Sequence, residues 1–197
     1  MVVCLIAALL GCTVGTMIRR AVRGSWPLTE VCTALIFGAL TWDLWPSALL
    51  LPHLFAASCG VALSAIDWRL HRLPDSLILP SYPVLLLLIA VAAPFAGGWV
   101  VVYGAALGAV AAFAVYLTFK AFSPSLGGGD VKASGLVGML LGMLGPHTWL
   151  AGMAAGPCLA GVYALCLLAT RRGRLSDPLP FGPFLFAGGL VGILISP

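Results

Sequence analysis

Residues 61–94, VALSAIDWRLHRLPDSLILPSYPVLLLLIAVAAP, decide the fold class, because they place a short charged segment between two apolar runs. The first run ends at Asp67, and the second begins at Leu77 and reaches Pro94 without a charged residue. Apolar runs of about 20 residues are long enough to cross the hydrocarbon core of a membrane as helices. This stretch therefore predicts two membrane helices joined by a short polar loop.

The composition of the whole chain agrees with a membrane protein. Of the 197 residues, 61% are hydrophobic and 8% are charged, and the mean hydropathy is +1.11. A soluble domain usually has about a quarter of its residues charged, so a water-soluble fold is improbable. Because apolar stretches recur along almost the whole length, we expect residues 1–197 to form a single integral membrane domain.

The apolar runs predict an all-α bundle of about eight transmembrane helices. The expected helices are residues 2–18, 30–45, 47–66, 77–95, 98–119, 132–146, 148–170 and 181–196. The second and the sixth are near the short end of the length that crosses about 30 Å of hydrocarbon. Seven spans, or one re-entrant segment, are therefore open alternatives.

The basic residues predict the orientation of the bundle. All ten Lys and Arg fall in four segments: Arg19, Arg20 and Arg23; Arg69 and Arg72; Lys120 and Lys132; Arg171, Arg172 and Arg174. With eight helices, these segments share one end of the bundle, and the connections at the other end carry no cation. The positive-inside rule makes the basic end cytoplasmic and puts both termini outside. Topology thus accounts for the net charge of +4, and we expect a lipid bilayer and no nucleic acid as partner.

Two of the six acidic residues stand at the ends of predicted helices in the opening stretch. Asp67 ends an apolar run, and ionisable groups are costly within a bilayer, so it is a candidate functional residue. The simpler interpretation is an interfacial acid paired with Arg69 or Arg72. Asp75 follows Pro74 and precedes an apolar run, which is typical of a helix N-cap.

The second candidate segment is Gly127-Gly128-Gly129-Asp130-Val131-Lys132, between the fifth and sixth predicted helices. Three glycines give the backbone conformations that other residues avoid, and they let another backbone approach the Asp130 carboxylate. The segment lacks the GxxxxGK[ST] spacing of a phosphate-binding loop. We therefore expect this segment to present Asp130 to an extended peptide.

Asp67 and Asp130 are 63 positions apart in sequence, but the predicted topology places them at the same end of the bundle. Two carboxylates within a few Å of each other do not both ionise readily, so they share a proton. Such a pair can deprotonate a water molecule and protonate a peptide carbonyl, as hydrolysis requires. No metal or cofactor is indicated, because the cysteines lie in apolar runs without a CxxC pair and the histidines are scattered.

Two other functions use the same acids. In a small proton- or cation-coupled transporter, Asp67 and Asp130 would relay ions and the glycines would line a broken helix. In a purely structural partner of a membrane assembly, the acids would only pair with Arg69, Arg72 and Lys132.

Four segments, in this order along nearly the whole chain, resemble the prepilin peptidases, or type IV leader peptidases, within the GxGD intramembrane aspartyl proteases. They are residues 26–37 (WPLTEVCTALIF), 67–80 (DWRLHRLPDSLILP), 126–132 (LGGGDVK) and 179–189 (LPFGPFLFAGG). The resemblance implies catalytic roles for Asp67 and Asp130. It leaves an auxiliary or structural role to five residues: Asp75, Gly127, Gly128, Gly129 and Lys132.

The resemblance also implies a location and a substrate. The family consists of endopeptidases of the bacterial plasma (inner) membrane that remove the basic leader from prepilins or pseudopilins near the cytoplasmic face. Fuller members carry a cytoplasmic domain with zinc-binding cysteine pairs, associated with methylation from S-adenosylmethionine. In this sequence only residues 19–25 occupy that place, so we expect a short, peptidase-only form. The sequence leaves open which precursors are cut and in what oligomeric state the protein works.

Overall fold

The computed structural model describes residues 2–22, 28–122, 126–172 and 179–195, and these ranges contain helices and no strand. The α-helices are α1 (Val2–Ala21), α2 (Leu28–Leu44), α3 (Leu50–Leu70), α4 (Asp75–Ala92), α5 (Val100–Phe122), α6 (Gly128–Gly142), α7 (Pro146–Ala169) and α8 (Phe181–Leu194), and a short 3-10 turn, η1 (Ala93–Phe95), follows α4. The predicted all-α bundle is confirmed.

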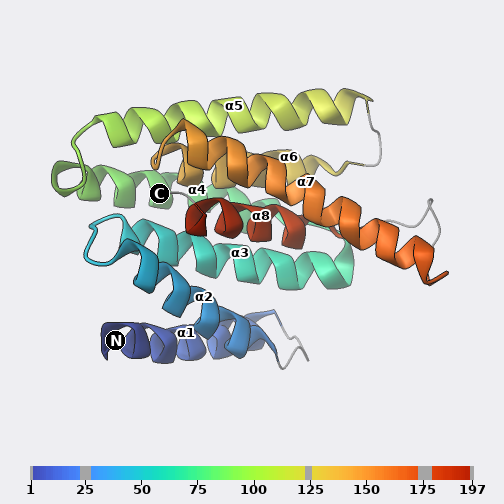
Figure 1. Cartoon of the computed structure of the whole chain (residues 1–197), viewed down its shortest axis with the longest axis horizontal. Coiled ribbons are helices and arrows are strands. Elements are labelled where there is room, and N and C mark those ends of the chain that lie inside the picture. Colours follow the sequence, from blue (N-terminus) through green and yellow to red (C-terminus); the bar gives the residue numbers. More distant parts are fainter. Residues whose placement is uncertain (1, 23–27, 123–125, 173–178, 196–197) are drawn as a thin grey trace.

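The helices run back and forth along the long axis of the molecule (Figure 1). Helix α1 begins and α8 ends at one end of the bundle, where the α2–α3, α4–α5 and α6–α7 connections also lie (Figure 1). At the opposite end, the last turns of α1, α3 and α5 carry basic residues: Arg19, Arg20, Arg69 and Lys120. This is the separation of charge that the sequence predicts, although Arg23 and Arg174 lie outside the described residues.

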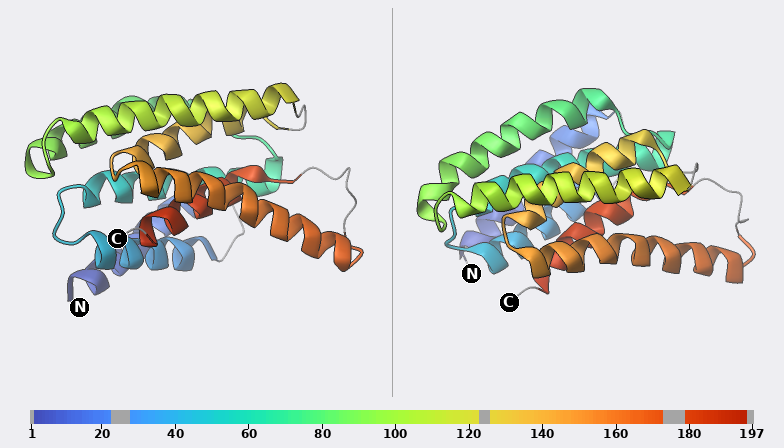
Figure 2. Two further views of the ribbon diagram at one scale, coloured as in Figure 1. Left: turned by 45° about the horizontal axis from the view of Figure 1, so that its top comes forward. Right: turned by 90° about the horizontal axis from the view of Figure 1, so that it is seen from above.

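Helices α3, α6 and α8 form the centre of the bundle. Helix α3 contacts α1, α2, α4, α6 and α8, and α6 contacts α3, α4, α5, α7 and α8. Helix α5 lies on the opposite side of the molecule from α1 (Figure 2). The inward faces of α3, α6 and α8 are therefore surrounded by other helices.

The outer helices present large apolar side chains to their surroundings. Leu5 on α1, Leu107 on α5 and Leu165 on α7 are 62%, 71% and 67% exposed, as suits contact with lipid acyl chains. Five helices in the described chain, α1, α3, α4 with η1, α5 and α7, are long and apolar enough to cross a membrane. The chain is therefore a multi-pass membrane protein, in which α2, α6 and α8 are the shorter helices.

Glycines let neighbouring helices pack at close range. At the α5–α6 contact a Cβ on Gly138 would clash with Ala112 and with the backbone of Gly108. At the α7–α8 contact a Cβ on Gly188 would clash with the backbone of Gly156. Small residues at helix contacts are typical of membrane proteins, where association depends on van der Waals packing.

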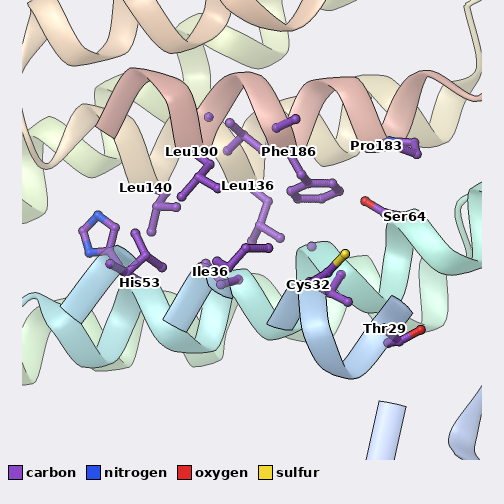
Figure 3. A pocket seen from close by; sticks show the side chains of 18 residues that line it. Thr29, Cys32, Ile36, His53, Ser64, Leu136, Leu140, Pro183, Phe186 and Leu190 are labelled. Carbon is purple, nitrogen blue, oxygen red and sulfur yellow. The ribbon is translucent and has the colours of Figure 1, made fainter. Parts of the chain in front are cut away.

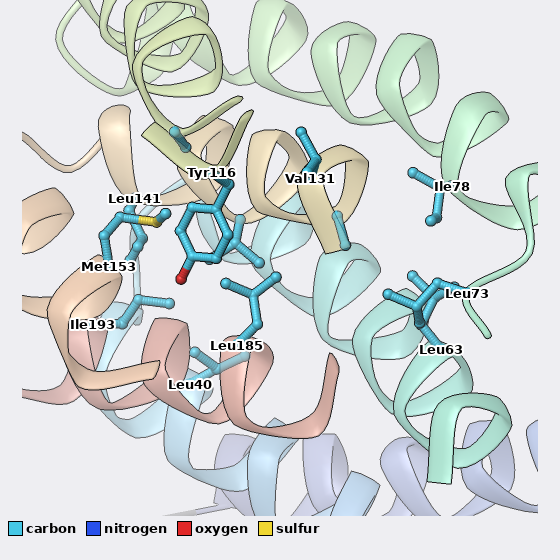
Figure 4. Close-up of a cluster of buried hydrophobic side chains, with 13 residues drawn as sticks. Leu40, Leu63, Leu73, Ile78, Tyr116, Val131, Leu141, Met153, Leu185 and Ile193 are labelled. Atoms are coloured by element: carbon cyan, nitrogen blue, oxygen red, sulfur yellow. The ribbon is translucent and has the colours of Figure 1, made fainter. Parts of the chain in front are cut away.

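The main apolar core extends to the basic end of the bundle. It includes Leu63 on α3, Tyr116 on α5, Val131 on α6 and Leu185 on α8 (Figure 4). Leu73, in the α3–α4 connection, belongs to the same cluster and is 9% exposed. The core thus continues to the segments in which the sequence predicts the catalytic residues.

Two helices begin earlier than the apolar pattern indicates. Helix α6 begins at Gly128, four residues before the predicted start at 132, so Asp130 is in a helical turn. Helix α4 begins at Asp75, with Pro74 as the N-cap residue in an extended conformation. Asp75 is therefore the first helical residue and not the N-cap, as its position after Pro74 had indicated. In both cases the first turn is polar, which conceals it from a search for apolar runs.

Candidate active site

Asp67 lies in the last turn of α3, and only 4% of it is exposed. Its Oδ2 accepts a hydrogen bond of 2.9 Å from the backbone N–H of Gly182. Gly182 is in the first turn of α8, where backbone N–H groups have no partner within the helix and favour a negative charge. Asp67 therefore caps α8 from a different helix.

The Gly182 position requires glycine for reasons of space. A Cβ there would lie 2.9 Å from Asp67 Oδ2 and 3.3 Å from Leu73 Cδ2. Any larger residue would push the carboxylate away from the N–H that binds it. The similarity of residues 179–189 to a family segment thus has a structural counterpart in this contact.

The α3–α4 connection turns sharply after Asp67. His71 ends α3 in a left-handed conformation, with φ 49° and ψ 38°, and its N–H donates to the carbonyl of Asp67. The chain then passes Leu73 and re-enters a helix at Asp75. This turn brings Leu73 back beside Asp67, because Leu73 Cδ2 faces the Gly182 position.

Asp130 is the third residue of α6 and is half-buried. Its Oδ2 accepts a hydrogen bond of 3.0 Å from the N–H of Gly127. The carboxylate therefore satisfies one of the free N–H groups at the start of its own helix. Each of the two aspartates is thus bound at a helix N-terminus.

The three glycines before Asp130 each lie close to another group, and Gly129 faces atoms that cannot readily move. Gly127 has φ −67°, which any residue adopts, and Gly128 and Gly129 are helical. A Cβ would meet Asp130 Oδ2 at 2.9 Å from position 127, Lys120 Nζ at 3.0 Å from position 128, and Leu73 Cβ at 2.7 Å from position 129. Close approach, and not an unusual backbone, is what these glycines provide.

Leu73 connects the two aspartate segments. It packs against Gly182, which binds Asp67, and against Gly129, which precedes Asp130. The carboxylates of Asp67 and Asp130 also interact electrostatically. In the described chain no hydrogen bond joins these two carboxylates, and each binds a backbone N–H of a helix start.

Charged and polar groups near the two aspartates include several that sequence reasoning missed. Lys120, at the end of α5, interacts electrostatically with Asp130, and His71 interacts with Asp67. Tyr116 interacts with Asp130, and its buried hydroxyl has no hydrogen-bond partner among the described residues. Lys120 could have been found from the charge pattern, which puts it at the same end as both acids. No sequence signal indicates the Tyr116 contact.

Asp75 and Lys132 form an ion pair that connects α4 to α6. Lys132 Nζ lies 2.6 Å from Asp75 Oδ2, and the two side chains are 37% and 53% exposed. A second contact parallels it, because the Tyr82 hydroxyl donates to the backbone carbonyl of Lys132 at 2.5 Å. These contacts fix the start of α6 relative to α4, which fits an auxiliary role for Asp75 and Lys132.

The site offers carboxylates, backbone N–H groups and nearby cations as its chemical groups. Among the described residues no three His, Cys, Asp or Glu side chains lie together so that they could hold a metal ion. Asp67 and Asp130 come from different helices, and Leu73 packs against the glycine that binds Asp67 and the glycine that precedes Asp130. Such an arrangement can supply one group that accepts a proton and one that donates it.

The fold and this site define a class of protein: multi-pass helical membrane proteins with two aspartates at one end of the bundle. The chain belongs to the type IV leader peptidase family, whose model matches residues 54–165, more than half of the chain. The matched range contains both Asp67 and Asp130.

Curated relatives extend the similarity over most of the chain. A prepilin leader peptidase/N-methyltransferase of Pseudomonas putida is 32% identical over 89% of this chain and 60% of its own length. Proteins of the same name in Burkholderia pseudomallei (strain 1026b) and Dickeya chrysanthemi are 34% and 35% identical, over 87% and 89% of this chain. The chain spans 55% and 62% of these two relatives. No solved structure gives a significant match.

Proposed function

We propose that the protein is a membrane-embedded aspartic endopeptidase that removes the basic leader from type IV prepilin-like or pseudopilin precursors. The observation that carries the proposal is that Leu73 packs against Gly182, whose N–H binds Asp67, and against Gly129, which directly precedes Asp130. Both aspartates lie within the family-matched range. The names of the curated relatives support the leader peptide as substrate.

In the proposed mechanism the two carboxylates share one proton. The ionised carboxylate takes a proton from a water molecule, and the water oxygen attacks the scissile carbonyl carbon while the other carboxyl group protonates the carbonyl oxygen. The tetrahedral intermediate then collapses, the C–N bond breaks, and the leaving nitrogen receives a proton from the pair. The pair acts as one unit, so we assign no fixed acid or base.

The N–H groups of Gly182 and Gly127 orient the two carboxylates before substrate arrives. Each carboxylate accepts this bond through Oδ2, which leaves Oδ1 for a water molecule or a peptide. Pre-oriented groups contribute to catalysis because little reorganisation is needed during the reaction. We therefore assign Gly127 and Gly182 a positioning role.

The proposed site faces the cytoplasm. Arg19, Arg69 and Lys120 are in the last turns of α1, α3 and α5, at the same end of the bundle as Asp67, and basic residues flanking membrane helices favour the cytoplasmic side. A precursor with an apolar membrane segment and a basic cytosolic leader would present its cleavage point at this border. The peptide must unwind there, because a helix keeps its carbonyl groups in internal hydrogen bonds.

Cleavage of a leader-bearing prepilin by the purified protein in lipid nanodiscs tests the function. We expect Asp67→Asn and Asp130→Asn each to abolish cleavage, measured by the masses of the products, while the proteins keep the wild-type helical circular dichroism. Asp43→Asn is the matched control, because Asp43 is an exposed acid at the end of α2, at the opposite end of the bundle. Full cleavage by either Asp67→Asn or Asp130→Asn would overturn the aspartic mechanism.

A further inference from the structure

An apolar cavity of about 220 Å³ lies between α2, α3, α6 and α8 (Figure 3). Ile36 on α2, Ala57 on α3, Leu136 on α6 and Phe186 on α8 are among the residues that line it. Apolar cavities of roughly 150 Å³ hold a benzene molecule. This cavity is therefore large enough for one or two large apolar side chains, and too small for a whole helix.

One end of the cavity adjoins the candidate active site. Pro183 lines it and directly follows Gly182, whose N–H binds Asp67. Ser64 also lines it and is three residues before Asp67 on α3, so both side chains lie on one face of that helix. A peptide bound at Asp67 would have this end of the cavity beside it.

The other end of the cavity contains a polar side chain, His53 (Figure 3). His53 lines it, 11 residues before Ser64 on α3, which is roughly 16 Å along an α-helix. Its Nδ1 lies 2.7 Å from the carbonyl oxygen of Leu49, so Nδ1 must be the donor and Nε2 carries the lone pair. That Nε2 is buried and has no hydrogen-bond partner in the described chain. An occupant carrying a hydroxyl or N–H group would satisfy it.

The packing of α2 leaves a lateral way into the cavity. Helix α2 packs chiefly on α1 and α3 and has few contacts with α8. Figure 3 shows α2 and α8 on opposite sides of the cavity. Because α2 is an apolar helix with few contacts to α8, we infer that the apolar segment of a substrate can reach the cavity between these two helices.

We propose that this cavity is the pocket for apolar side chains on the membrane side of the cleaved bond. This assignment rests on the proposed peptidase function. The leader remains at the basic end, and the apolar segment enters between α2 and α8. His53 accepts a hydrogen bond from a side chain such as Thr or Ser deeper in that segment. Cleavage therefore depends on the size of apolar side chains after the cut.

Two alanines of α3 provide a matched test of the pocket. Ala57 lines the cavity and Ala62 does not, although both are half-buried on the same helix. We measure kcat/KM for a prepilin with Leu at the first apolar positions after the cut and for a version with Ala there. Small changes in an apolar pocket alter kcat/KM by about 10- to 200-fold. We expect Ala57→Leu to lower kcat/KM for the Leu substrate by about 10-fold or more, and Ala62→Leu to keep the wild-type preference.

The outcomes separate this pocket from the peptidase function itself. A wild-type protein that cuts neither substrate contradicts the proposed function. A wild-type protein that cuts both, with the same ratio of kcat/KM in Ala57→Leu and Ala62→Leu, overturns the pocket alone.

A disulfide capture experiment tests the pocket without hydrolysis. Cys32 on α2 lines the cavity, so we keep it and replace the other cysteines, Cys4, Cys12, Cys59, Cys158 and Cys166, by alanine in the Asp67→Asn protein. Prepilins with one cysteine at successive positions are then oxidised with this protein. We expect cross-links from the apolar segment and none from the leader, and loss of these cross-links in Ala57→Leu. Equal cross-linking along the whole substrate, or a phospholipid retained in place of any cross-link, overturns the proposal.

The His53 contact has its own test. His53→Phe keeps an aromatic ring and removes the Nε2 acceptor. Among prepilins with Thr in place of Val at successive apolar positions, we expect one Thr substrate to be preferred by the wild type and this preference to disappear in His53→Phe. A wild type that shows no such preference, or a His53→Phe protein that keeps it, contradicts the role of His53.

Discussion

Gly129 illustrates how a single missing Cβ shapes the site. A Cβ there would lie 2.7 Å from Leu73 Cβ and 3.1 Å from the Leu73 carbonyl oxygen, and neither atom belongs to a flexible end. Adding a methyl group at this position must therefore move the backbone on one side of the aspartate pair. An alanine in place of glycine would be harmless in most helices, where alanine is favoured over glycine.

We expect Gly129→Ala to cost about 1 to 3 kcal/mol of stability through overpacking and to reduce cleavage strongly, since Leu73 lies between the two aspartate segments. Gly161→Ala on α7 is the control, because a Cβ at position 161 meets nothing within 4 Å. Thermal unfolding in detergent and the cleavage rate check both variants. Equal behaviour of the two alanine variants would contradict the packing of Leu73 on Gly129.

The hydroxyl of Tyr116 is a second residue-scale feature with a measurable consequence. Tyr116 is 2% exposed and its hydroxyl has no hydrogen-bond partner in the described part of the chain. Removing a buried polar group that has no partner is close to neutral or stabilising. We therefore expect Tyr116→Phe to unfold at the wild-type temperature or slightly above it, and a clearly lower unfolding temperature would show that the hydroxyl has a partner.

At the scale of helices, the apolar pattern predicted the number of helices and most of their limits. It failed at the start of α6, because Gly127 to Asp130 are neither apolar nor good helix formers. Tertiary packing on Leu73 and the hydrogen bond from Gly127 to Asp130 hold that turn in the helix. The sequence also could not indicate that Asp67 caps α8, since this bond joins residues 115 positions apart.

The α5–α6 contact gives a prediction for helix packing. Gly138 is buried against Ala112 and the backbone of Gly108, so a methyl group there must separate the helices. We expect Gly138→Ala to destabilise the protein by about 1 to 3 kcal/mol, measured by unfolding in mixed micelles. Gly38→Ala on α2 is the control, because its nearest neighbour, Ala8 Cβ, is at an ordinary 3.9 Å. No difference between the two variants would mean that α5 and α6 are less closely packed.

The ion pair between α4 and α6 predicts only a small loss of stability when it is removed. Asp75 and Lys132 are both substantially exposed, and exposed pairs contribute about 0.2–1 kcal/mol. We expect Asp75→Asn to lower stability by no more than about 1 kcal/mol and to leave cleavage within a few-fold of the wild-type rate. Complete loss of cleavage in a folded Asp75→Asn protein would move Asp75 into the chemistry.

At the scale of the whole molecule, charge and topology agree. The sequence could predict the gathering of basic residues at one end, because the positive-inside rule depends only on where these residues lie relative to the membrane helices. It could not predict the cavity, which depends on how α2, α3, α6 and α8 meet. Runs of apolar residues show which helices exist, whereas a cavity between helices depends on how their side chains pack.

Labelling of single cysteines in intact cells tests the orientation. In a protein whose six natural cysteines are replaced by alanine, we expect Gly98→Cys in the α4–α5 connection to react with a membrane-impermeant thiol reagent. Arg72→Cys in the α3–α4 connection should react only after the membrane is permeabilised. The reverse pattern would put the aspartates outside the cytoplasm and contradict the proposed substrate access.

The bond between Asp67 and Gly182 gives one carboxylate two duties. It anchors the first turn of α8, and in the proposed mechanism it also handles the proton of each hydrolysis. A change at position 67 therefore removes the cap of α8 together with the reactive group. The loss of cleavage in such a variant would therefore combine two effects, the missing proton-transfer group and a first turn of α8 that has lost its cap.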